Sequence, residues 1–120
     1  MTWLRSIFAC LFVLAATAAI AETYPARPVT IITPFAAGSQ TDSAARVVAQ
    51  ALQESLGQSF VIENKAGAGG NLAALSVAQS PPDGYTLLIV TSLLATKPSL
   101  YPTLGYDPIA DLVPVSLVCP

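Results

Sequence analysis

The sequence predicts an α/β fold in which a parallel sheet is built from repeated βα units. Three short apolar segments, at residues 29–33, 60–62 and 85–90, are each followed by a loop of small or hydroxyl-bearing residues. Helical spacing of apolar side chains follows the first two loops. Consecutive βα units joined by right-handed crossovers form a parallel sheet, and all their strand-to-helix loops lie at one edge of it.

The first 21 residues have the pattern of a secretory signal peptide and are not expected to belong to the fold. Arg5 supplies the positive charge, residues 7–18 form an apolar core, and Ala19-Ile20-Ala21 is a small-x-small cleavage site. The apolar stretch is shorter than the roughly 20 residues that span a bilayer. The pattern predicts export from the cytoplasm, no stable membrane insertion and a mature chain that starts at Glu22.

Composition limits the size and the partners of the mature chain. Removing the signal peptide leaves 120 − 21 = 99 residues, which is enough for one small domain. Arg5 is removed with it, so four basic and seven acidic side chains remain and the net charge is 4 − 7 = −3. Nucleic acid and anionic membrane surfaces are poor partners for a chain of this charge.

The first βα unit consists of a strand at 29–33, a small-residue loop at 35–40 and a helix that ends at Gly57. Thr41 or Asp42 is expected to cap this helix, because a short side-chain oxygen satisfies amides that lack a partner in the first turn. Apolar side chains at helical spacing are predicted to form its buried face: Ala44, Val47, Val48, Ala51 and Leu52.

The second unit consists of a strand at 60–62, a glycine-rich loop and a helix over 72–79. Asn71 is expected to cap this helix, and Pro81-Pro82 stops it because proline has no amide hydrogen to donate.

The third strand, at 85–90, is the one that the sequence most clearly predicts to be buried, since it is uncharged and rich in β-branched and aromatic residues. It leads into the hydroxyl pair Thr91-Ser92. The proline-rich segment that follows is predicted to be irregular, and residues 112–118 are predicted to form a last strand.

The three loops at 35–42, 67–71 and 91–92 are expected to converge on one crevice, because ligands of open α/β sheets bind outside the carboxyl ends of the strands. Helix N-termini and hydroxyls offer hydrogen-bond donors there, which favours an anion such as a carboxylate. Taken alone, one such loop is better explained by a tight turn and close helix-to-sheet packing than by anion binding. Phe35 either lines a ligand pocket or plugs the end of the sheet.

Nucleotide binding is disfavoured by the same residues. Gly67 and Gly69 begin a GxGxxG pattern, but Leu72 stands where its third glycine would be, and no GK[ST] sequence of a P-loop occurs. We expect no cofactor.

Catalysis is also disfavoured. The chain has no histidine, so neither a His-based triad nor a usual zinc site can be built, and no catalytic or metal-binding residue is expected. An exported hydrolase that uses Ser39 or Ser92 is a weak alternative, because no base is visible for either serine. Lys65 and Lys97 could each pair with an anion, but a lone lysine near a loop is more often simply solvated.

The succession of PFAAG at 34–38, GAGGN at 67–71 and DGYTLL at 83–88 resembles the Bug, or TctC-like, extracytoplasmic solute receptors of tripartite tricarboxylate transporters. The resemblance implies a two-lobed, hinge-closing periplasmic binding protein of the type II (Venus flytrap) fold, which is not an enzyme. It implies a small carboxylate as ligand, either a di- or tricarboxylate or an acidic amino acid, and transporter membrane subunits as partners.

By the same resemblance, residues 22–120 correspond to the N-terminal part of the first lobe, without the second lobe. A truncated fragment with no function of its own is the alternative to a working receptor.

The resemblance also assigns ligand-binding roles. The loop at 35–42 is implied to wrap a ligand carboxylate through backbone amides and bound water, and Thr91-Ser92 to add polar contacts. The family often has glycine where this chain has Ser39, Ala73 and Val90. The candidate ligand-binding residues are Phe35, Ala37, Gly38, Ser39, Thr41, Asp42, Gly69, Gly70, Thr91 and Ser92.

Overall fold

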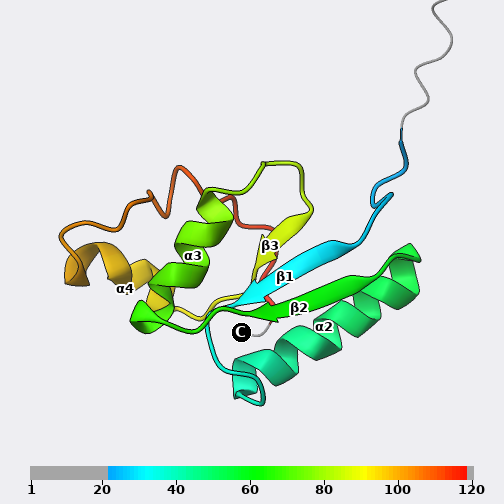
Figure 1. Ribbon diagram of the computed structural model, residues 1–120, viewed down its shortest axis with the longest axis horizontal. Helices are drawn as coiled ribbons and strands as arrows, with labels where there is room; N and C mark the ends of the chain where they lie inside the picture. Colours follow the sequence, from blue (N-terminus) through cyan, green and yellow to red (C-terminus); the bar gives the residue numbers. More distant parts are fainter. Residues whose placement is uncertain (1–21, 119–120) are drawn as a thin grey trace, which may run out of the picture.

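The protein is described by a computed structural model that covers residues 22–118, so the predicted signal peptide lies outside the described residues. Its sheet has three strands in the order β2-β1-β3 (Figure 1). The strands are β1 at Val29–Thr33, β2 at Phe60–Asn64 and β3 at Thr86–Leu88. Both pairings of β1 are parallel, which confirms the predicted parallel sheet.

Two helices cover this sheet. Helix α2 (Gln40–Leu56) packs against β1 and β2, whereas α3 (Asn71–Ala78) packs against β1 and β3. The connection from β1 to β2 and the connection from β2 to β3 run in opposite directions across the sheet. Right-handed crossovers of this kind place the two helices on opposite faces.

The central strand β1 is the most deeply buried one, and the third strand, which the sequence most clearly predicted to be buried, is only half-buried. Val29, Ile31 and Ile32 are almost completely shielded from solvent, whereas the residues of β3 are only half-buried. The physical reason is the strand order: β3 lies at an edge of the sheet and β1 has a neighbour on each side.

The buried face of α2 differs by one position from the predicted one. Ala45 and Ala49 are buried, while Ala44, Val47 and Ala51 are exposed. Ala49 joins a core cluster with Val29, Ile31 and Phe60, against which Leu52 also packs. Alanine and valine occur on both sides of this helix, so the apolar spacing is compatible with two orientations of the helix about its axis. In the observed orientation the carboxylate of Asp42, described below, is on the buried face with Ala45 and Ala49.

The helix boundaries also correct two predicted caps. Helix α2 is capped by Ser39, whose Oγ accepts a hydrogen bond of 3.2 Å from the amide of Asp42, and not by Thr41 or Asp42. Gly57 ends this helix in the left-handed conformation, as predicted. Asn71 is the first residue of α3 and not its cap.

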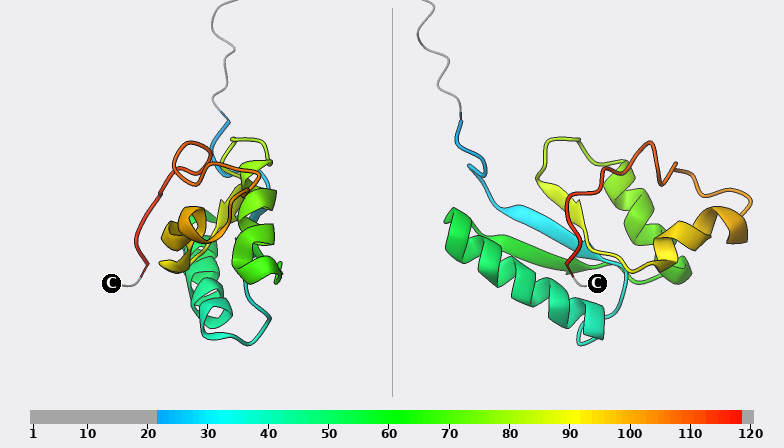
Figure 2. Two further views of the ribbon diagram at one scale, coloured as in Figure 1. Left: turned by 90° about the vertical axis from the view of Figure 1, so that its left-hand side faces the viewer. Right: turned by 180° about the vertical axis from the view of Figure 1, so that it is seen from behind.

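Two predictions about the C-terminal third are wrong. A helix, α4, forms at Leu93–Leu100 and contains Pro98, although the proline had suggested irregular structure. Residues 112–118 form no strand, and most of their side chains are exposed. A strand requires a hydrogen-bonding neighbour, and within residues 22–118 this segment pairs with none. Helix α4 lies beyond the carboxyl ends of the strands (Figures 1 and 2).

The N-terminal segment is bound to the turn that precedes β3, at the amino ends of the strands. Tyr24 donates a hydrogen bond of 2.6 Å to the carbonyl of Gly84, and Arg27 forms an ion pair of 2.8 Å with Asp83. The Arg27 guanidinium also lies 3.9 Å from the centre of the Tyr85 ring. These contacts fix the start of β1 and leave its carboxyl end free to form a site.

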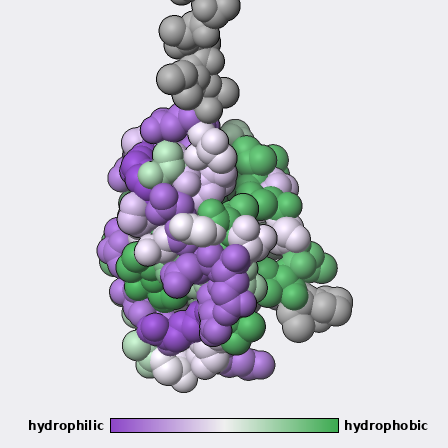
Figure 3. All heavy atoms as spheres, turned by 90° about the vertical axis from the view of Figure 1, so that its right-hand side faces the viewer, coloured by the Kyte–Doolittle hydropathy of each residue, from purple (hydrophilic) through white to green (hydrophobic). Residues whose placement is uncertain are grey.

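The described surface mixes polar and apolar residues (Figure 3). No helix within residues 22–118 combines the length and the hydrophobicity that a membrane crossing needs.

Candidate functional site

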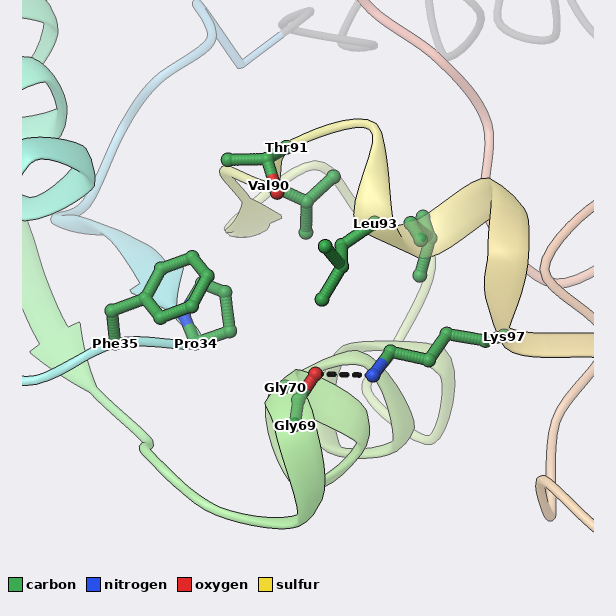
Figure 4. Close-up of a pocket in the computed structure, with 9 residues that line it drawn as sticks. Pro34, Phe35, Gly69, Gly70, Val90, Thr91, Leu93 and Lys97 are labelled. Carbon is green, nitrogen blue, oxygen red and sulfur yellow. Dashed lines mark hydrogen bonds between the residues drawn. The ribbon is translucent and has the colours of Figure 1, made fainter. Parts of the chain in front are cut away.

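A shallow hollow, open to solvent, lies at the carboxyl ends of the strands (Figure 4). It is formed where the chain leaves β1 and β3, together with the 3₁₀ turn η2 (Ala68–Gly70) and the first turns of α4. Its lining consists of Pro34, Phe35, Gly69, Gly70, Val90, Thr91, Leu93, Leu94 and Lys97.

Four of the ten candidate residues line this hollow together: Phe35, Gly69, Gly70 and Thr91. They come from all three of the loops that were expected to converge. Thr91 contributes a hydroxyl, while Phe35 faces the hollow as an apolar wall (Figure 4). The Gly69 carbonyl accepts a hydrogen bond from Lys97, and the Gly70 amide donates one to the carbonyl of Gly67. The six remaining candidates do not belong to the lining: Ala37, Gly38, Ser39, Thr41, Asp42 and Ser92.

Asp42 is buried and its carboxylate is saturated by protein donors. Oδ2 accepts hydrogen bonds from the Gly38 amide and from Arg46 Nε, each at 2.9 Å. Oδ1 accepts from Asn64 Nδ2 at 2.9 Å and from Arg46 Nη2 at 3.3 Å. Asn64 Nδ2 also donates to the carbonyl of Phe35 at 3.0 Å. Asp42 is therefore a positioning residue that ties the 35–42 loop to the end of β2.

These donors shift the ionisation of Asp42. The hydrogen bonds from Arg46, the Gly38 amide and Asn64 together lower the pKa of Asp42 from 3.8 to about 2, against the opposing effect of burial. Because the folded-state pKa lies below the unfolded one, the ionised carboxylate stabilises the fold above the unfolded pKa, and this contribution is lost as the pH falls through the folded pKa.

We therefore expect the stability difference between the wild-type protein and an Asp42→Asn variant to shrink between about pH 4 and pH 2. Denaturant midpoints of both full-length proteins, measured across this range, test the expectation. A difference that stays constant down to about pH 2 would show that ionised Asp42 does not contribute in this way.

The turn η2 approaches β1 closely because two glycines adopt left-handed backbone conformations. Gly69 has φ of 61° and Gly70 has φ of 91°. A Cβ added to Gly70 would lie 3.0 Å from the Cβ of Pro34, so a side chain at this position would press on the end of β1. The glycines therefore allow both the tight turn and the close packing of η2 against Pro34.

Lys97, for which the sequence favoured solvation over pairing with an anion, is the charged residue that lines this hollow. Its side chain is not solvated as predicted, because the residue is only 3% exposed. Its ammonium donates a hydrogen bond to the carbonyl of Gly69 (Figure 4). Leu93 and Lys97 are four residues apart and so share a helical face, but this signal is informative only once the segment is known to be helical.

The two serines of the hydrolase alternative have other environments. Ser39 caps α2 through its hydroxyl oxygen, and Ser92 is exposed, outside the lining of the hollow. These positions give no support to a nucleophilic role for either serine.

Comparison with known sequences places the chain in a family. The model of the tripartite tricarboxylate transporter family receptor, TctC, matches residues 44–119. Protein BugT of Bordetella pertussis is 52% identical over 100 residues, which are 82% of this chain and 31% of that protein. A UPF0065 protein from the TAR-I ttuE-ttuC′ intergenic region of Agrobacterium vitis is 48% identical over 97 residues, 81% of this chain and 28% of that protein. The chain thus spans about a third of the length of these relatives.

Solved structures of periplasmic binding proteins contain the same arrangement of strands and helices. The periplasmic binding protein BugD superposes with a TM-score of 0.68 at 47% identity, over 71% of this chain and 28% of that chain. MatC from Rhodopseudomonas palustris, solved with bound malate, superposes with a TM-score of 0.69 at 42% identity, over 79% of this chain and 33% of that chain. The R. palustris protein Rpa4515, solved with adipate, superposes with a TM-score of 0.68 at 48% identity, over 72% of this chain and 29% of that chain. The matched residues and these identities show that the chain belongs to the TctC family of tripartite tricarboxylate transporter receptors.

Proposed function

We propose that this chain is the N-terminal part of the first lobe of a periplasmic solute receptor that binds a small carboxylate. The observation that carries the proposal is the hollow at the carboxyl ends of β1 and β3, where residues of three loops surround a buried ammonium and a hydroxyl, those of Lys97 and Thr91. Its position agrees with the general rule for ligand sites in open α/β sheets. Two structural neighbours, MatC with malate and Rpa4515 with adipate, hold dicarboxylates.

The proposal includes the route and the partners of the receptor. The N-terminal pattern of Arg5, an apolar core and a small-x-small site supports export by a cleaved signal peptide. The chain spans about a third of its relatives, so a second lobe that closes over the hollow would be supplied by residues outside this sequence. Membrane subunits of a tripartite tricarboxylate-type transporter would take up the released ligand.

The test is a ligand screen by thermal shift, followed by calorimetry. It uses the full-length protein, which means the complete receptor with the residues outside this sequence. The panel contains succinate, malate, adipate, citrate and glutamate, each paired with its fully amidated analogue. We expect at least one carboxylate to raise the melting temperature, with a stabilisation of about 2.7 kcal/mol when it is present at about 100 times its Kd. No amide should reproduce this shift. A receptor that responds to amides or to none of the acids would contradict the proposal.

A further inference from the structure

We propose that Lys97 is the counter-ion of one ligand carboxylate, and that it selects ligands whose end inside the hollow carries a full negative charge. The inference rests on the proposed function and names the group that would discriminate between ligands at that site.

The first argument is the burial of an ammonium without a matching anion. Lys97 is 3% exposed, and burying a charge is unfavourable unless it is paired. The ion pairs found within residues 22–118 join Arg27, Arg46 and Lys65 to acidic groups, and none of them involves Lys97. A carboxylate that entered the hollow would supply the missing negative charge.

The second argument is hydrogen-bonding capacity. A lysine ammonium has three donors, and the described part of the chain supplies one acceptor to Lys97, the carbonyl of Gly69. The face of the Tyr101 ring, whose centre lies 5.1 Å from Nζ, adds attraction for a cation but no hydrogen-bond acceptor. Donor capacity is therefore left for a ligand.

The third argument is the character of the surrounding walls. Pro34, Phe35, Val90 and Leu93 make much of the lining apolar, and Lys97 is the charged residue in it (Figure 4). Apolar walls lower the local dielectric, which strengthens an ion pair formed there and makes an unpaired carboxylate costly. An uncharged ligand end could accept a hydrogen bond from the ammonium but would leave its charge unpaired.

A purely structural role for Lys97 has to be distinguished from this proposal. The hydrogen bond to Gly69 connects α4 to η2, so the ammonium could serve only to hold α4 in place. A tether predicts that its removal destabilises the ligand-free protein. A buried counter-ion without its ligand predicts the opposite, because replacing an unpaired buried charge by an apolar group of similar volume is neutral or stabilising.

The experiment uses Lys97→Met in the full-length protein, because methionine keeps much of the aliphatic volume and removes the charge. Lys65→Met is the matched control, since Lys65 pairs with Glu63 and with Ser76 away from the hollow. Calorimetry measures the Kd for the tightest of succinate, malate and adipate, and thermal unfolding measures the ligand-free stability of each variant.

For Lys97→Met we expect a Kd at least about 30-fold higher, with an unchanged or raised ligand-free melting temperature. Lys65→Met should bind like the wild type, and Lys97→Arg should keep most of the affinity. Wild-type-like binding by Lys97→Met, or a lower affinity together with a lower ligand-free melting temperature, would overturn the role of Lys97. If the wild-type protein binds none of the acids, the proposed function itself fails. If the wild type binds an acid and Lys97→Met binds it equally well, only the role of Lys97 fails.

Discussion

Replacing Asp42 by alanine should weaken ligand binding by the full-length protein and lower its melting temperature by roughly 5–10 °C. The change removes the acceptor shared by the Gly38 amide, Arg46 and Asn64. Gly38 and Arg46 are exposed and Asn64 is half-buried, so the cost lies in the lost charge-assisted hydrogen bonds and in the unpaired amide hydrogen of Asn64. The 35–42 loop loses its connection to the end of β2, and the position of Phe35 in the wall of the hollow becomes less defined.

Asp107→Ala is the control for this result. The Asp107 carboxylate also accepts backbone hydrogen bonds, from the amides of Ile109 and Ala110, but the residue is exposed and does not line the hollow. Its loss should lower stability slightly and leave ligand affinity unchanged. Calorimetry and thermal unfolding on both variants make the comparison. Equal affinity in Asp42→Ala and the wild type would refute the positioning role of Asp42.

Replacing Gly70 by alanine should destabilise the full-length protein by about 2–5 kcal/mol, the combined effect of a left-handed backbone and an overpacked contact. The backbone at Gly70 has φ of 91°, and the added Cβ would lie 3.0 Å from Pro34. Since Pro34 and Gly70 both line the hollow, any shift that relieves this contact also changes the shape of the site. Ligand affinity should therefore fall together with stability.

Gly57→Ala separates the two contributions. Gly57 has φ of 71° at the end of α2, and a Cβ there would meet no atom within 4 Å. Only the backbone cost, about 1–2 kcal/mol, should appear in this variant. Denaturant unfolding measures the loss of stability in each variant. The loss in Gly70→Ala minus the loss in Gly57→Ala is the contribution of the overpacked contact with Pro34. If Gly57→Ala proves as damaging as Gly70→Ala, the close approach of η2 to Pro34 is not the cause.

Local patterns in the sequence were sufficient to predict the repeated βα units. The β-branched strand at 29–33, the small-residue loop and the glycine that ends α2 each carry their own signal, and they agree with one another. What local patterns do not contain is the order of strands in the sheet. The uncharged third strand was therefore expected to be buried, although its edge position leaves it half-buried.

The candidate site was predictable only in outline. Loops that follow parallel strands must meet at one edge, and residues from all three loops do line the hollow. The roles within the loops depend on tertiary contacts: Asp42 turns inward because Arg46 and Asn64 surround its carboxylate. Solvation was favoured over anion pairing for Lys97 because Pro98 argued against a helix there, and because burial of a charge cannot be seen in a sequence without its surroundings.

The central position of β1 has a consequence for the order in which the fold assembles. Along the chain, one helix, α2, separates β1 from β2, whereas α2, β2 and α3 all lie between β1 and β3. Closing the shorter loop loses less chain entropy, so β1, α2 and β2 should assemble first and β3 should dock onto the exposed edge of β1 later. The hollow draws its walls from β1, η2 and α4, so it would be completed among the last events of folding. Competence to bind a ligand would then be a kinetic marker of the finished sheet.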